Sequence, residues 1–194
     1  VTIVARDAPF ALARFCGVLS ANDANILDAE IFTRRDGMII DRFRVADFAS
    51  RSALTPDQCE RICNELEDVF SGRTDLRHLL ARHRTKWKRR SRPLNPNIRL
   101  DVEFEEHPRF TIVDVYAADT LGFLYRITES ISQLGLNIAF AKIATRGDGI
   151  VDSFYVADER GQRITDANHL TMIRTALIDT VRDTAETEMI VGDF

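Results

Sequence analysis

The sequence has few of the residues that form disulfide frames or metal sites in small proteins. Only three of its 194 residues are cysteine and only four are histidine. The cysteines are Cys16, Cys59 and Cys63, an odd number, with the last two one helical turn apart. This pattern indicates reduced, partly buried thiols and favours neither disulfides nor a zinc site. We therefore expect a cytoplasmic location.

Signals for membrane insertion and for catalysis are also missing. No stretch reaches the roughly 18 apolar residues that a membrane span requires, and no segment resembles a signal peptide. None of the histidines (His78, His83, His107 and His169) lies in a metal-binding motif, and there is no glycine-rich phosphate loop. We expect no catalysis and no cofactor from this chain, and no membrane partner. Because it begins at Val1 inside an apparent strand, we interpret it as part of a longer protein.

Charge is unevenly distributed along the chain. The net charge is −4, which argues against nucleic acid as a partner. Between Arg73 and Arg92, however, nine arginine or lysine residues face one acid, Asp75. This basic segment is either a solvated helix and linker or a surface that contacts phosphate, nucleotide or another protein domain.

The strongest signal is an internal repeat. When the sequence is shifted by 112 positions, residues 7–37 align with residues 119–149 without a gap, and 12 of the 31 positions are identical. Deleting one residue then aligns Asp41, Phe43 and Val45 with Asp152, Phe154 and Val156. Two copies of one small module are therefore expected.

Hydrophobic patterns give each copy the order βαββαβ. In the second copy we predict strands at 110–117, 137–145, 150–157 and 188–191, and helices that begin near Leu124 and Leu170. In the first copy we predict strands at 2–5, 25–34, 38–45 and 98–104, and helices at 9–21 and 56–70, the latter capped by Thr55. Leu76, Leu79, Leu80 and His83 indicate an additional short helix.

These elements predict an α+β fold of two ferredoxin-like modules, each an antiparallel four-stranded sheet with both helices on one face. We place the first domain at 1–106, with a basic insertion at 72–97 before its last strand, and the second at 107–194. Phe43 and Phe154 are expected to point toward the helices, which disfavours the RNA-recognition proteins that share this strand order. Tyr155 is an exception.

The second copy resembles the ACT-domain signature. Asp119-Thr-Leu-Gly122-Phe-Leu124, followed by Leu136-Asn137-Ile138, is similar to the pattern D-x-P-G-L-L and L-N-I of that family. The segments 25–37, 124–128 and 136–156 also resemble the carboxyl-terminal tandem ACT domains of bifunctional PII uridylyltransferase/uridylyl-removing enzymes. The resemblance covers essentially the whole chain.

The resemblance implies glutamine, or another small amino acid, as the ligand. Gly122 lets a ligand approach the backbone, and the helix that follows favours a carboxylate. Asn137 offers both a donor and an acceptor. The predicted site residues are Asp119, Leu121, Gly122, Phe123, Leu124, Asn137 and Ile138. A structural role remains an alternative, with Gly122 serving helix packing and Asn137 fixing a turn.

The first copy departs from the signature. Phe10 replaces Gly122 and is expected to fill the space that the ligand backbone needs. We predict a weaker or lost site there, formed by Asp7, Phe10, Ala11, Asn25 and Ile26.

The resemblance further implies partners outside the chain. These are the catalytic domains of a parent enzyme, for which magnesium is expected, and the PII protein, whose uridylylation and deuridylylation those domains control. An alternative is an ACT regulator that acts through protein contacts without a catalytic partner. Pairing of modules within one chain or in a homodimer stays open. Asp41 and Asp152 are expected either to pair with Arg14 and Arg126 or to be solvated.

Overall fold

The computed structural model describes residues 1–34, 36–87, 99–118, 120–146 and 149–189. Within these ranges the chain forms seven strands and five helices. Their order is β1 (Thr2–Arg6), α1 (Ala11–Ala21), β2 (Ala24–Phe32), β3 (Met38–Asp47), α2 (Pro56–Phe70), α3 (Leu76–Trp87), β4 (Asp101–Glu106), β5 (Thr111–Ala118), α4 (Phe123–Gln133), β6 (Asn137–Arg146), β7 (Gly149–Ala157) and α5 (Ala167–Met189). The predicted α+β class is confirmed.

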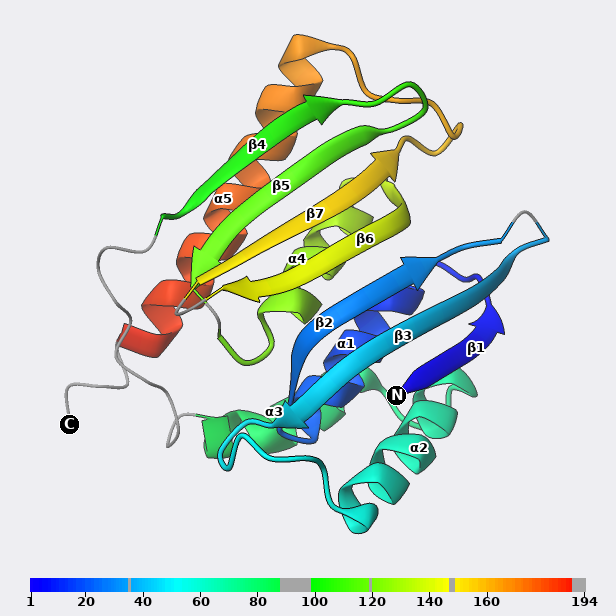
Figure 1. Cartoon of the computed structure of the whole chain (residues 1–194), viewed down its shortest axis with the longest axis vertical. Coiled ribbons are helices and arrows are strands. Elements are labelled where there is room, and N and C mark those ends of the chain that lie inside the picture. The colour runs from blue at the N-terminus through cyan, green and yellow to red at the C-terminus, as the bar shows by residue number, and fades with distance from the viewer. Residues whose placement is uncertain (35, 88–98, 119, 147–148, 190–194) are drawn as a thin grey trace.

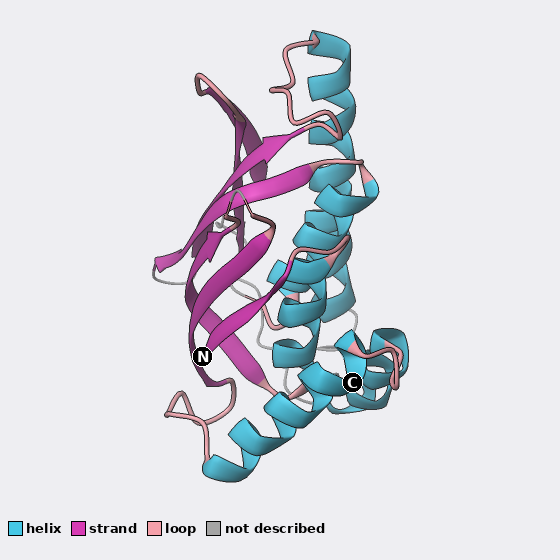
Figure 2. Ribbon diagram, turned by 90° about the vertical axis from the view of Figure 1, so that its right-hand side faces the viewer, coloured by secondary structure: helices cyan, strands magenta, loops and turns pink. Residues whose placement is uncertain are grey.

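The strands of both modules form one continuous sheet (Figure 1). The strand order is β1-β3-β2-β6-β7-β5-β4, and every neighbouring pair is antiparallel. The helices cover one face of this sheet, and Figure 2 shows the other face free of helices. We call this second face the open face. The core therefore lies between the sheet and a single helical layer.

Local sequence explains the main elements. Strand side chains alternate between the core and the open face, so Phe43 and Phe154 are fully buried under the helices, as predicted. At the start of α2 the Thr55 hydroxyl accepts a hydrogen bond from the Gln58 N–H at 3.3 Å, and the Gln58 side chain accepts one from the Thr55 N–H at 2.9 Å. This reciprocal cap confirms the predicted helix start.

The two modules pair within the one chain. Strands β2 and β6 run antiparallel, with Glu30 directly opposite Lys142, its counterpart in the repeat. In the helical layer α1 packs against α4, where the buried thiol of Cys16 lies within hydrogen-bonding reach of its own counterpart, Thr128. A pseudo-two-fold axis therefore passes between β2 and β6 and relates the copies.

The predicted fourth strands are wrong in their placement. The strand expected at 98–104 forms as β4, but it pairs with β5 at the far edge of the second module and not with β1. Only His107–Phe110 separates β4 from β5, so a hairpin closes at a much smaller entropy cost than a return to β1. Because β4 occupies this edge, Glu188 and Met189 remain in α5. Residues 190 and 191 lie outside the described ranges.

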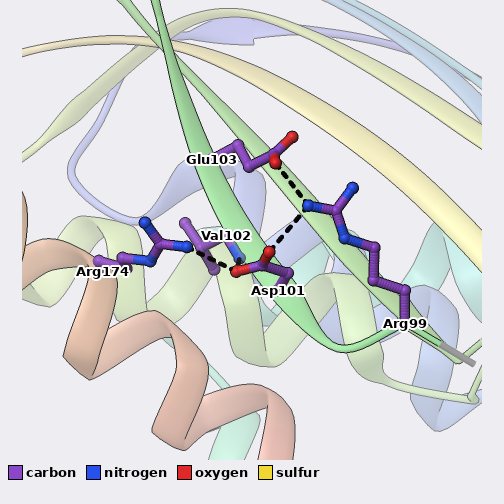
Figure 3. Close-up of polar contacts among 5 residues, drawn as sticks. All are labelled: Arg99, Asp101, Val102, Glu103 and Arg174. Atoms are coloured by element: carbon purple, nitrogen blue, oxygen red, sulfur yellow. Dashed lines mark hydrogen bonds and ion pairs between the residues drawn. The ribbon is translucent and has the colours of Figure 1, made fainter.

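A polar network fastens β4 to the second module (Figure 3). The Asp101 carboxylate binds Arg174 of α5 and Arg99, each at 2.8 Å, and it also accepts the Val102 N–H. Arg99 additionally binds Glu103 and stacks over Tyr116 of β5, 4.1 Å from the ring centre. Hydrogen bonds from Arg99 and Arg174 lower the pKa of the Asp101 carboxyl to about 2. The contacts join β4 to both neighbouring elements.

The basic segment begins as the predicted additional helix, α3. Its Leu79 and Leu80 are buried, together with Val18 of α1 and Val69 of α2. Two exposed ion pairs, Arg73–Asp68 and Arg82–Glu65, connect the segment with α2. Residues 88–98 of the predicted insertion lie outside the described residues.

The placement of β4 can be tested with Val102, which is fully buried in a strand that packs against α5. Val102→Ala should lower the free energy of unfolding by about 2 kcal/mol because it leaves a cavity. Native-state hydrogen exchange should then accelerate in β5 and β7. Leu100→Ala removes an exposed side chain from the same segment and serves as the control. Faster exchange in β1 and β3 would contradict the placement.

Candidate ligand site between the modules

Among the cavities at the junction of the modules, two are related by the pseudo-two-fold axis. The larger has a volume of about 430 Å³ and the smaller about 20 Å³. Each is lined by the β-to-α loop of one module and by the start of the second strand of the other module. Each candidate site is therefore assembled from both copies.

The larger cavity combines the first module's loop with the second module's strand β6. It is lined by Asp7, Ala8, Pro9, Phe10, Ala11, Leu12, Ile31, Thr33, Ile39, Asp41, Ser132, Gly135, Leu136, Asn137, Ile138 and Glu159. The Asn137 side chain donates a hydrogen bond to the Asp158 carbonyl at 3.2 Å, which fixes its carboxamide. Glu159 covers Gly135, where a Cβ atom would lie 3.2 Å from the carboxylate oxygen.

The smaller cavity has the reverse composition. Leu121, Gly122, Phe123 and Leu124 of the second module line it together with Asn25 and Ile26 of the first. Asp152, the counterpart of Asp41, also lines it and is buried. At about 20 Å³ the smaller cavity is too small to hold a free amino acid.

The grouping of predicted site residues by module is therefore wrong. Asn137 and Ile138 join Asp7, Phe10 and Ala11, whereas Asn25 and Ile26 join the Gly122 loop. The physical reason is the β2–β6 pairing, which brings the start of each of these strands to the loop of the other module. Asp119 lies outside the described residues.

The expectation that Phe10 fills its site is also wrong. Phe10 has the left-handed backbone of its counterpart Gly122, with φ angles of 63° and 82°. Its side chain is 40% exposed, and the cavity beside it is the larger one. The backbone geometry of the glycine loop is thus retained at Phe10, at the conformational cost that an L-residue bears there.

The first turn of α1 supplies an electropositive end to the larger cavity. Phe10 is the N-cap residue, the Ala11 N–H donates to the Ala8 carbonyl at 3.0 Å, and no side chain of the described residues caps the helix. Backbone N–H groups at an uncapped N-terminus favour an anion, such as a carboxylate.

A buried carboxylate supplies the opposite charge. Asp41 of β3 is fully buried and lines the cavity; its Oδ1 accepts the Phe32 N–H at 3.2 Å. Among the described residues Oδ2 has no hydrogen-bond partner. Burial raises the pKa of the Asp41 carboxyl to about 6, the Phe32 hydrogen bond opposes this shift and Asp7 adds to it. Such a group readily accepts a cation or a proton donor from a ligand.

Neither predicted environment of Asp41 is observed. The carboxylate is not solvated, and in the described part of the chain no ion pair joins it to Arg14, whose guanidinium lies over the Phe70 ring at 5.8 Å. Burial raises the pKa of the nearby Cys16 thiol well above its usual value, and Asp41 and Asp152 raise it further. The thiol is therefore neutral and a poor nucleophile.

An uncapped helix start and a buried carboxylate thus line the same small cavity. This arrangement suits a zwitterion, whose carboxylate meets the helix and whose ammonium group meets Asp41. Among the described residues, no three His, Cys, Asp or Glu side chains are grouped to hold a metal ion. Within the same ranges no helix has the length and apolar character needed to cross a bilayer.

The raised pKa of Asp41 predicts a pH-dependent stability. The folded pKa of about 6 lies above the ordinary value of 3.8, so the favourable contribution of the protonated acid is complete below pH 4. This contribution is lost as the pH rises through 6, which lowers the free energy of unfolding by up to about 3 kcal/mol. Asp41→Asn should remove this loss, which urea unfolding between pH 4 and 7.5 measures. Parallel stability profiles of the two proteins would contradict the assignment.

Known proteins share sequence with this chain. Residues 106–184 match the ACR family N-terminal ACT domain. The chain is 33% identical over 91% of its length to the bifunctional uridylyltransferase/uridylyl-removing enzyme of Bradyrhizobium diazoefficiens and 35% identical over 99% to that of Nitrobacter hamburgensis. The enzyme of that name from Azospirillum brasilense is 34% identical over 94% of the chain.

The chain spans 19 to 20% of the length of these relatives. The family match supports a regulatory role for the chain. Residues 106–184 thus resemble an ACT domain, and nearly the whole chain is similar to part of the bifunctional uridylyltransferase/uridylyl-removing enzymes.

Proposed function

We propose that this chain is the amino-acid-sensing region of a bifunctional uridylyltransferase/uridylyl-removing enzyme and that glutamine is its ligand. The observation that carries the proposal is the cavity of about 430 Å³ shared by both modules. Its volume lies in the range of small-molecule sites, and its charges match an amino-acid zwitterion. The names of the relatives supply the enzymatic context.

In this proposal each end of the ligand has a separate partner. The α-carboxylate lies at the start of α1, and the ammonium group donates to the unpartnered Oδ2 of Asp41. The side-chain amide of the ligand forms hydrogen bonds with the polar groups of Asn137, Ser132 and Thr33, which line the cavity. A hydrogen-bonding site of this kind distinguishes glutamine from an isosteric apolar amino acid.

Regulation follows from the composition of the site. Because the ligand contacts both modules, it stabilises the arrangement in which they are packed as observed. If attached catalytic domains differ in activity between arrangements of the modules, the binding free energy of the ligand shifts their activity by favouring one arrangement. We propose that high glutamine shifts such domains from uridylylation of the PII protein toward deuridylylation, and that this chain performs neither reaction.

Calorimetry with a panel of amino acids tests the ligand and the site together. Glutamine should bind with one site per chain, and Asp41→Asn should weaken it by roughly 10- to 100-fold because a charge-assisted hydrogen bond is lost. Asp152→Asn changes the equivalent carboxyl in the smaller cavity and should leave the affinity within about twofold. Binding of a different amino acid alone would refute glutamine. Equal losses in both variants would refute the site.

A further inference from the structure

We infer that the open face of the sheet is a self-association surface on which a second copy of this chain packs face to face. The inference concerns a surface remote from the helical layer and does not depend on the identity of the ligand. It starts from a row of apolar side chains that crosses the sheet at right angles to its strands.

The row contains one side chain from each of six adjacent strands. Strand register pairs Val4 with Ile40, Phe32 with Phe140, Phe140 with Tyr155 and Tyr155 with Ile112. Phe32 lies opposite Ile40, since Glu30 pairs with Arg42 and Thr33 with Ile39. The apolar row is therefore Val4, Ile40, Phe32, Phe140, Tyr155 and Ile112.

Much of this row is exposed to solvent. Val4 is 62% exposed, Phe32 54%, Ile40 39% and Phe140 36%. The Phe140 and Tyr155 rings meet edge to face with centres 5.2 Å apart, and Tyr155 also contacts His107 and Phe110. Contiguous apolar surface of this kind is uncommon on a face that remains in water.

The repeat shows that the fold does not require apolar residues here. The first-module counterparts of Phe140 and Tyr155 are Asp28 and Arg44, which are paired in register and form an exposed ion pair at 3.4 Å. The same two positions thus carry an ion pair in one module and an aromatic pair in the other. Because charge is compatible with the backbone at these positions, the aromatic pair needs another explanation, which burial against a partner provides.

Charge favours a second copy as that partner. On the open face the outer strands of the first module carry Arg6, Arg42 and Arg44, whereas β4 at the opposite edge carries Asp101, Glu103 and Glu105. A two-fold axis along β6, the middle strand of the described sheet, places β3 of one copy over β5 of the other. Positive strands then face negative strands, which is complementary across an isologous interface.

The same axis aligns the middle of the apolar row with itself. In the apolar row, Phe140 meets Phe140 of the second copy, Phe32 meets Tyr155 and Ile40 meets Ile112. In the neighbouring row, Arg42, whose side chain is 73% exposed and forms a surface ion pair with Glu30 at 3.4 Å, lies over Asp114 of β5. Asp114 is 8% exposed, and among the described residues its Oδ1 has no hydrogen-bond partner. An arginine approaching from above would supply one.

Sedimentation equilibrium of the 194-residue chain, over a series of concentrations, tests the inference. The wild-type chain should dimerise reversibly. The double variant Phe140→Asp with Tyr155→Arg copies the ion pair of the first module and should weaken dimerisation by roughly 30-fold or more, because it removes the centre of the interface. Circular dichroism should show that the double variant remains folded, as its first-module counterpart predicts.

A matched control and a charge variant complete the experiment. Met172→Asp changes a more exposed apolar residue on α5, at 63% exposure, and should leave the dimer unchanged. Arg42→Glu should weaken dimerisation about tenfold at low salt. A wild-type chain that stays monomeric would overturn the inference. The apolar row would then be covered by another domain of a longer protein and not by a second copy. A dimer that survives the double variant, or one that Met172→Asp disrupts, would also overturn it.

Discussion

The antiparallel pairing of β2 with β6 is the interaction on which the rest of the structure depends. It joins two small sheets into one and removes an open edge from each module. Unpaired backbone groups at such an edge would otherwise pair with strands of other chains. It also brings α1 against α4, so that the helical layer is continuous. Neither module alone lines the whole of the larger cavity. The pairing therefore converts a sequence duplication into a single functional unit.

The pseudo-symmetry that follows is incomplete, and the departures from it carry the functional interpretation. One cavity is open at about 430 Å³ and its counterpart is nearly closed at about 20 Å³, although Asp41 and Asp152 occupy equivalent buried positions. On the open face an ion pair in the first module is replaced by the Phe140–Tyr155 pair in the second. The two copies thus differ on both faces of the sheet, in the size of the cavity on one side and in the apolar surface on the other.

Much of the fold could be predicted from the sequence, because local patterns determine it. Periodicity and the Thr55 cap located the helices, and the repeat predicted two modules of one type. The position of β4 could not be predicted by analogy between copies, since it is decided by the short connection to β5 and by contacts of Asp101 with Arg174, 73 residues away. The grouping of the candidate site residues could not be predicted for a similar reason: Gly122 and Asn137 are close in sequence, but the strand pairing separates them into different cavities. The duplicated Asp41 on an apolar strand was the available signal for the cavity carboxylate.

The central claim is that the first module's loop and the second module's strand together form the ligand site. Nuclear magnetic resonance with isotope-labelled glutamine measures this most directly, through nuclear Overhauser effects between ligand and protein. The account predicts effects from one bound glutamine to the amides of Ala11 and Leu12 at the start of α1 and to the side chain of Asn137. Effects to Gly122 and Asn25, with none to Asn137, would contradict it.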